Sequence, residues 1–123
     1  MSTIAMVLIV LVAFLHVYFL VLEMFLWTKP LGLKTFRNSA EKAEMTRVLA
    51  ANQGLYNGFL AAGLLWAVAT SRLDVAIFFL VCVVVAGAYG AYSVNRRIFF
   101  IQAVPALAAI TALLVWLDGI DLR

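Results

Sequence analysis

Four runs of about 20 mostly apolar residues follow one another along this chain, and no other feature constrains its fold as strongly. They cover roughly residues 4–27, 47–70, 75–94 and 98–117. An α-helix needs about 20 apolar residues to cross the hydrocarbon of a bilayer. The short connections after the second and third runs favour antiparallel neighbours. We therefore predict an all-α integral membrane protein, with four antiparallel transmembrane helices in an up-down bundle that forms a single domain over residues 1–123.

The composition excludes several other classes of protein. Of the 123 residues, 67% are hydrophobic and 12% are charged, with a mean hydropathy of +1.10. A soluble domain of this size cannot bury so much apolar surface in one core. One Cys and one His exclude a disulfide framework and the usual zinc spacings, so we expect no metal and no cofactor. The expected partner is the lipid bilayer and not nucleic acid, because the basic residues lie between apolar runs.

The connection over residues 28–46 is the longest, and it contains helix boundary signals. Pro30 and Gly32 are expected to stop the first helix, and Asn38 or Ser39 is expected to cap a new one. The second span is therefore expected to begin as a short amphipathic helix in the aqueous or headgroup layer. The first run lacks a basic start and a small-residue cleavage site, so we interpret it as a retained helix and not as a signal peptide. In the fourth run, Pro105 predicts a kink.

The distribution of Lys and Arg predicts the orientation. Two basic residues, Arg72 and Arg123, lie on the side that holds the second connection and the chain end. The first and third connections carry seven: Lys29, Lys34, Arg37, Lys42, Arg47, Arg96 and Arg97. Under the positive-inside rule this bias predicts a cytoplasmic connection 28–46, both termini extracytoplasmic, and residence in the plasma (inner) membrane.

Polar residues converge on the cytoplasmic half of the predicted spans, when turns are counted at ~1.5 Å per residue. Amides that face lipid each cost several kcal/mol, roughly the desolvation of an unpaired polar group, so these side chains are expected to pair or to line a wet cavity. We predict a pocket that opens to the cytoplasm and binds a small molecule. Its candidate residues are His16, Glu23, Asn52, Gln53, Tyr56, Asn57, Tyr89, Arg96 and Gln102.

Each candidate also has a purely structural interpretation. The three amides of the second span, including Asn57, share one broad predicted face and are equally suited to hold helices together. His16 fits a hydrogen-bonded packing residue, and Tyr89 fits an interfacial aromatic residue. Glu23 needs a partner, such as an arginine of the connections or an amide, because a carboxylate inside an apolar helix is costly.

Small residues gather on the other side of the second span. Gly54, Gly58, Ala61 and Ala62 form a surface that lets helix backbones approach closely. We expect this surface, with its counterpart on the third span, to join protomers of a homo-oligomer.

Three stretches resemble a known family: "LEMFLWTKPLGLKTF" (22–36), "VLAANQGLYNGFLAAGLLW" (48–66) and "AGAYGAYSVNRRIFFIQAVPAL" (86–107). They are similar to the small membrane proteins grouped as domain-of-unknown-function family 1304. The resemblance implies a four-helix integral membrane protein without an agreed activity. The architecture is also similar to that of the membrane-associated eicosanoid and glutathione metabolism proteins, although a non-acidic residue stands where their second helix has Glu.

Two main function classes follow, and the first is preferred. In the first, a homo-oligomer binds or transports a small amphipathic or polar solute, with Glu23 as its charged contact. In the second, a membrane enzyme acts on a lipid-soluble substrate, with His16 or Glu23 as acid or base and Arg96 or Arg97 holding an anion. No constellation of nucleophile, base and orienting group supports the second class. A third possibility is a structural partner of another membrane protein.

Overall fold

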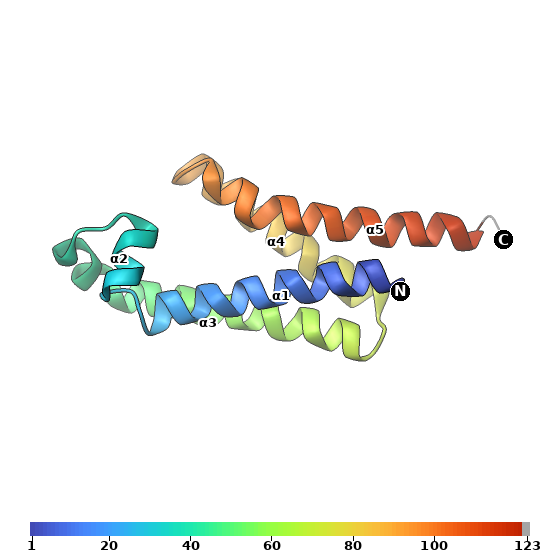
Figure 1. The fold of residues 1–123 in the computed structure, drawn as a ribbon, viewed down its shortest axis with the longest axis horizontal. Coiled ribbons are helices and arrows are strands. Elements are labelled where there is room, and N and C mark those ends of the chain that lie inside the picture. Colours follow the sequence, from blue (N-terminus) through green and yellow to red (C-terminus); the bar gives the residue numbers. More distant parts are fainter. Residues whose placement is uncertain (122–123) are drawn as a thin grey trace. The chain divides into compact units, whose positions relative to one another are not determined.

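All regular elements are helical in the computed structural model, which describes residues 1–121 (Figure 1). The elements are α1 (Thr3–Met24), α2 (Pro30–Phe36), α3 (Ala40–Ala69), α4 (Leu73–Ser93), the π-helical turn η1 (Phe99–Ala103) and α5 (Val104–Asp121). The described residues contain no strand, so the prediction of an all-α protein is confirmed. Arg123, which entered the count of charges, lies outside the described residues.

Three of the helical segments are long and apolar enough to cross a membrane. They are Thr3–Met24, Leu73–Ser93 and Phe99–Leu117. The longest helix, α3, has 30 residues and is not among them, since charged residues and amides interrupt its apolar sequence. The fold is therefore compatible with a membrane protein, and the use of α3 as a fourth crossing stays a prediction.

The chain divides into two compact units. The first, called the α1–α3 unit, is Phe14–Ala61 and contains the second part of α1, all of α2 and most of α3. The second, called the α4–α5 unit, is Met1–Ala13 with Ala62–Arg123, and contains α4, η1 and α5. The candidate site is built within the α1–α3 unit.

Glycines let α1 and α3 approach closely within the α1–α3 unit. A Cβ at Gly54 would lie 2.6 Å from Cγ of Met24 and 3.2 Å from the carbonyl oxygen of Leu20. A Cβ at Gly58 would lie 2.7 Å from Cδ1 of Leu20. The close helix packing predicted at these glycines is confirmed, but the partner is α1 of the same chain and not a second protomer.

Pro30 begins a helix where the sequence suggested only a stop. α1 ends at Met24, and α2 starts at Pro30, whose fixed φ and missing N–H suit the first position of a helix. Gly32 is buried, and a Cβ there would collide with the carbonyl oxygen of Leu26. The turn from α1 into α2 is therefore tight enough to require glycine.

Ser39 caps α3 as predicted. Its Oγ accepts a hydrogen bond from the backbone N–H of Lys42 at 3.1 Å. Arg37, just before it, adopts the left-handed conformation that ends α2, with φ 55°. Because its backbone N–H reaches the carbonyl of Leu33, the connection from α2 to α3 is closed by local bonds.

Within the α4–α5 unit, small residues again set the helix contact. A Cβ at Gly87 would lie 2.9 Å from the backbone nitrogen of Ala103, and one at Gly90 would lie 2.8 Å from Cγ2 of Ile98. The irregularity expected at Pro105 takes the form of η1, in which the N–H of Val104 bonds to the carbonyl of Phe99. Pro105 has no N–H to continue regular α-helical bonding, which favours such a π-helical turn before it.

A charged pair closes the turn between α3 and α4. Arg72 donates a hydrogen bond to Asp74 at 2.7 Å, and its guanidinium lies 5.9 Å from the ring centre of Trp66. The hydrogen bond to Asp74 raises the pKa of Arg72 above its ordinary value. The guanidinium thus lies within the distance of a cation–π contact with the indole.

Candidate functional site

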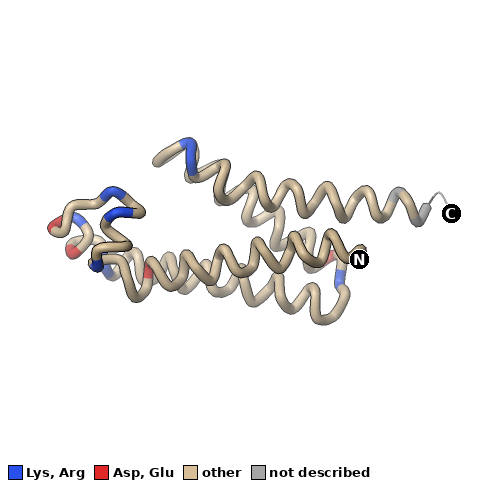
Figure 2. The backbone as a smooth tube through the Cα atoms, in the orientation of Figure 1, with Lys and Arg blue, Asp and Glu red and all other residues tan. Residues whose placement is uncertain are grey.

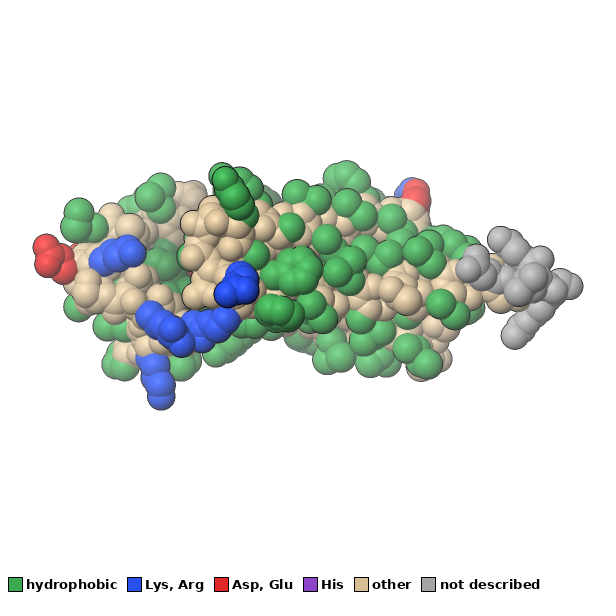
Figure 3. Space-filling view, turned by 90° about the horizontal axis from the view of Figure 1, so that it is seen from above, with side chains coloured by type: hydrophobic (Ala, Val, Ile, Leu, Met, Phe, Trp, Pro, Cys, Tyr) green, Lys and Arg blue, Asp and Glu red, His purple; other side chains and the backbone are tan. Residues whose placement is uncertain are grey.

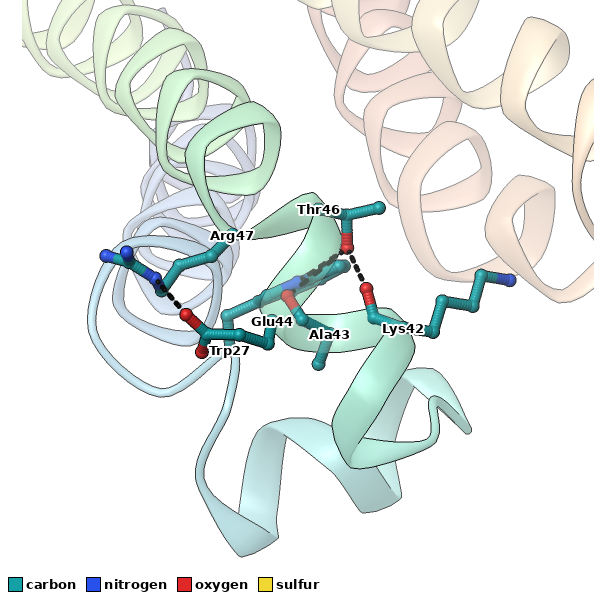
Figure 4. Close-up of polar contacts among 6 residues, drawn as sticks. All are labelled: Trp27, Lys42, Ala43, Glu44, Thr46 and Arg47. Carbon is teal, nitrogen blue, oxygen red and sulfur yellow. Dashed lines mark hydrogen bonds and ion pairs between the residues drawn. The ribbon is translucent and has the colours of Figure 1, made fainter.

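A buried carboxylate and a buried amide meet between α1 and α3. Nδ2 of Asn57 donates a hydrogen bond to Oε1 of Glu23 at 2.5 Å. Glu23 is 9% exposed and Asn57 is 7% exposed. Of the partners predicted for Glu23, the structure therefore selects an amide. Arg47 instead pairs with Glu44 at 3.3 Å (Figure 4).

Helical spacing places this pair beside the glycine contact. At 3.6 residues per turn, Asn57 lies about 60° around α3 from Gly54, next to the face that touches α1. Glu23 itself contacts that face, since a Cβ at Gly54 would lie 3.1 Å from its Cβ. Because the glycines bring the two backbones together, short polar side chains can reach across.

Two acceptor atoms of the pair stay available. The hydrogen bond uses Oε1 of Glu23 and an N–H of Asn57, and leaves Oε2 of Glu23 and Oδ1 of Asn57 without another bond. Within residues 1–121, no fully inaccessible side-chain nitrogen or oxygen lacks a partner. These two oxygens are therefore within reach of water or of a small molecule.

The pair lies at the end of α1 and not in its middle. α1 has 22 residues, which extend ~33 Å and thus match the ~30 Å of hydrocarbon. Glu23 is the residue before the last of this helix, and Gly54 lies level with Met24. The site therefore lies at one end of an apolar segment that is long enough to cross a bilayer.

The structure separates the polar residues that we expected on one face of α3. Asn57 is buried, whereas Asn52, Gln53 and Tyr56 are exposed. Nδ2 of Asn52 donates to the carbonyl oxygen of Val48 in its own helix at 3.0 Å. The four residues share an arc of about 140° on α3, and Asn57 at one edge of it lies next to the contact with α1. Asn52 and Tyr56 lie about 160° around the helix from Gly54, far from that contact.

His16 lies on the same side of α1 as Glu23, two turns away, which is about 10 Å along the axis. Its ring is fully buried and packs edge-on against Phe19, with ring centres 5.4 Å apart. This environment fits the predicted packing role. It does not bring His16 into direct contact with Glu23.

The other three predicted site residues belong to the α4–α5 unit. Gln102 is partly buried in η1, close to the glycine contact of α4. Tyr89 and Arg96 are exposed. Among the candidates within the α1–α3 unit, Glu23 and Asn57 are in direct contact.

A tryptophan anchor was missed by the sequence analysis. Nε1 of Trp27 donates to Oγ1 of Thr46 at 3.1 Å, and that hydroxyl donates to the carbonyl of Lys42 at 2.8 Å (Figure 4). The Trp27 ring also packs against Phe36, with centres 4.8 Å apart. A separation of 19 residues along the sequence gives no signal that Trp27 would bond to Thr46. This anchor ties the end of α1 to both α2 and α3.

Charge within the α1–α3 unit is concentrated around α2 (Figure 2). The basic residues of the α1–α3 unit are Lys29, Lys34, Arg37, Lys42 and Arg47. Elsewhere, hydrophobic side chains dominate the surface in view in Figure 3. Within residues 1–121, no three His, Cys, Asp or Glu side chains gather as metal ligands would.

Comparisons with known proteins agree with the resemblance found in the sequence. The model of the family described as "Protein of unknown function (DUF1304)" matches residues 10–114. The chain is 28% identical over 114 residues to the uncharacterized protein YpaA of Lactococcus lactis subsp. lactis (strain IL1403). The matched region covers 89% of this chain and 96% of that protein. No solved structure matches. With most of its length matched by the family model, this chain belongs to the DUF1304 family.

Proposed function

We propose that this protein is an integral membrane protein that binds or transports a small polar or amphipathic solute at the Glu23–Asn57 pair. In this proposal α3 is the fourth crossing, and α2 lies at the cytoplasmic surface. The protein works as a homo-oligomer in the plasma (inner) membrane, with both termini extracytoplasmic.

One observation carries the proposal. A carboxylate is buried at the end of an apolar helix, and its partner is a neutral amide. Burial of a carboxylate is costly, and two amides would join α1 and α3 at a smaller cost. A charged group that is retained despite its cost, with acceptor atoms still accessible, fits a contact for a solute.

The surroundings give the solute a route to this pair. Asn52, Gln53 and Tyr56 are exposed on the part of α3 level with or beyond the end of α1. In this proposal they face water or headgroups, where their polar atoms are hydrated at little cost. Gln53 marks the approach to the site, because it lies about one turn along α3 from Asn57 and about 40° around the helix from it. Asn52, Tyr56, His16, Gln102, Tyr89 and Arg96 stay as further candidates.

Small molecules that purify with the protein test the proposal. Wild type, Glu23→Gln and the control Glu41→Gln, whose carboxylate is exposed in the first turn of α3, are purified in mild detergent and analysed by mass spectrometry. We expect Glu23→Gln to fold as well as the wild type, because an amide keeps the size and hydrogen bonding of the side chain. It should lose a molecule that wild type and Glu41→Gln retain. An unfolded Glu23→Gln protein, or identical molecules in all three, would show that Glu23 serves packing alone.

The orientation is tested separately by cysteine labelling in intact cells. Cys82 is replaced by Ser, and single cysteines are placed at the exposed positions Thr3 and Ala40. A reagent that does not cross the membrane should label position 3 and not position 40. The reverse pattern would move the site to the outer side and contradict the proposed orientation.

A further inference from the structure

The chemistry of the atoms left unpaired at the Glu23–Asn57 pair selects a class of ligand. We propose that this pair recognises a primary ammonium group, and the proposal rests on the binding function proposed above. It adds to that function two properties of the solute, namely a positive charge and hydrogen-bond donor groups.

Both unpaired atoms are acceptors. One N–H of the Asn57 amide points to Glu23, and its carbonyl oxygen stays available to accept a hydrogen bond from a ligand, beside the second N–H of the same amide. Glu23 offers its second carboxylate oxygen. A ligand that binds both atoms must therefore bring hydrogen-bond donors, and a primary ammonium carries three N–H groups and no acceptor. An anionic ligand would be repelled by the Glu23 carboxylate.

Within the described part of the α1–α3 unit, no basic side chain forms an ion pair with Glu23. Within residues 1–121, the ion pairs join Arg47 to Glu44 and Arg72 to Asp74, and neither includes Glu23. A buried carboxylate without a cationic partner gains most from an external cation, because charge-assisted hydrogen bonds are about twice as strong as neutral ones.

The depth of the site admits two sources of ammonium. Glu23 lies beside the end of α1, near the headgroup layer, so the ammonium can belong to a lipid headgroup or to a free amine. Both present the same R–NH₃⁺ group. The experiment must therefore separate them.

Three matched small molecules test the recognition in detergent. Ethanolamine carries an ammonium with N–H groups, choline carries a cation without them, and ethylene glycol is neutral. The thermal midpoint of the purified protein is followed against the concentration of each, because a ligand of the folded state raises it. We expect ethanolamine to bind wild type and Glu41→Gln, with choline roughly tenfold weaker or more. Glu23→Gln should bind ethanolamine about ten- to a hundredfold more weakly.

Nanodiscs test the lipid source. If free ethanolamine has no effect, phosphatidylethanolamine discs should stabilise wild type more than phosphatidylcholine discs do, and Glu23→Gln should lose that difference. Either positive result supports ammonium recognition and identifies its source. Phosphatidylglycerol discs control for general charge effects.

Three results would overturn the inference. Choline could bind wild type as tightly as ethanolamine does, or ethylene glycol could do so. Alternatively, neither ethanolamine in detergent nor phosphatidylethanolamine in nanodiscs could raise the thermal midpoint. The comparison of probes on wild type needs no variant, so it holds even if Glu23→Gln folds poorly. A non-ammonium molecule that purifies with wild type and is lost in Glu23→Gln would refute the ammonium and keep the proposed function. If no molecule that purifies with wild type is lost in Glu23→Gln, both the ammonium inference and the proposed binding function are refuted.

Discussion

Asn57 and Asn52 are the same residue type five positions apart on α3, and their surroundings differ completely. Asn57 lies beside the glycine contact, is buried and bonds to Glu23 of α1. Asn52 is exposed and bonds to its own helix. The comparison teaches that the role of an amide in an apolar helix depends on what faces it, and that close approach at Gly54 creates the polar site.

A second comparison supports the same conclusion. In the α4–α5 unit, Gly87 and Gly90 also bring segments close together, against Ala103 and Ile98. Those contacts are to backbone atoms and side-chain carbons, which include Cβ of Gln102. Small residues therefore set the distance between helices in both units, and the residues beside them decide whether a polar site results.

The largest expected effect is at the glycine contact. Gly54→Leu places atoms where Met24 and the Leu20 carbonyl already lie, and should destabilise the protein by about 3 kcal/mol. Ala69→Leu adds bulk at the exposed last position of α3 and serves as the control. Unfolding in detergent measures both. Equal stability of the two variants would remove the argument that Gly54 sets the α1–α3 distance.

The next effect concerns the amide. Asn57→Leu leaves the Glu23 carboxylate without its partner and should cost about 1.5–3 kcal/mol. Replacing both residues by Leu should recover much of the loss, because an apolar pair carries no unpaired charge. If Asn57→Leu is as stable as the wild type, the hydrogen bond contributes little and the site is not held as described.

The tryptophan anchor gives a smaller effect. Thr46→Val removes the acceptor of Trp27 and should cost about 1 kcal/mol, and the fluorescence of the protein should change as the indole loses its bond. Thr35→Val is the matched control, since the Thr35 hydroxyl bonds only to the Leu31 carbonyl of its own helix. Equal changes in both variants would argue against a specific anchor.

The smallest effect is expected at Asn52. Asn52→Ala should change stability by no more than about 0.5 kcal/mol, since the side chain is exposed. A loss as large as that of Asn57→Leu would show that Asn52 has a buried partner, for instance in a second copy of the chain, and would break the comparison.

Much of the fold could be predicted because apolar runs, caps and proline act locally. The all-helical fold, the Ser39 cap and an irregularity near Pro105 all follow from a few neighbouring residues. Pro30 was misjudged because the same residue that ends one helix can begin another.

The site was only partly predictable. Glu23 stands out in the sequence because a carboxylate in an apolar run is rare, and an amide was among its expected partners. Which amide it would be depends on the rotation of α3 about its axis, which the contacts of Gly54 and Gly58 with α1 determine. The Trp27–Thr46 bond depends on a tertiary contact over 19 residues and has no local signal.

An experimental structure of the protein in lipid, with the density beside Glu23 resolved, tests the central claim most directly. The account predicts a non-protein molecule whose donor groups lie about 2.7–3.2 Å from Oε2 of Glu23 and Oδ1 of Asn57. A protein side chain that fills this position and bonds to both oxygens would contradict it, because the pair would then join helices and bind nothing.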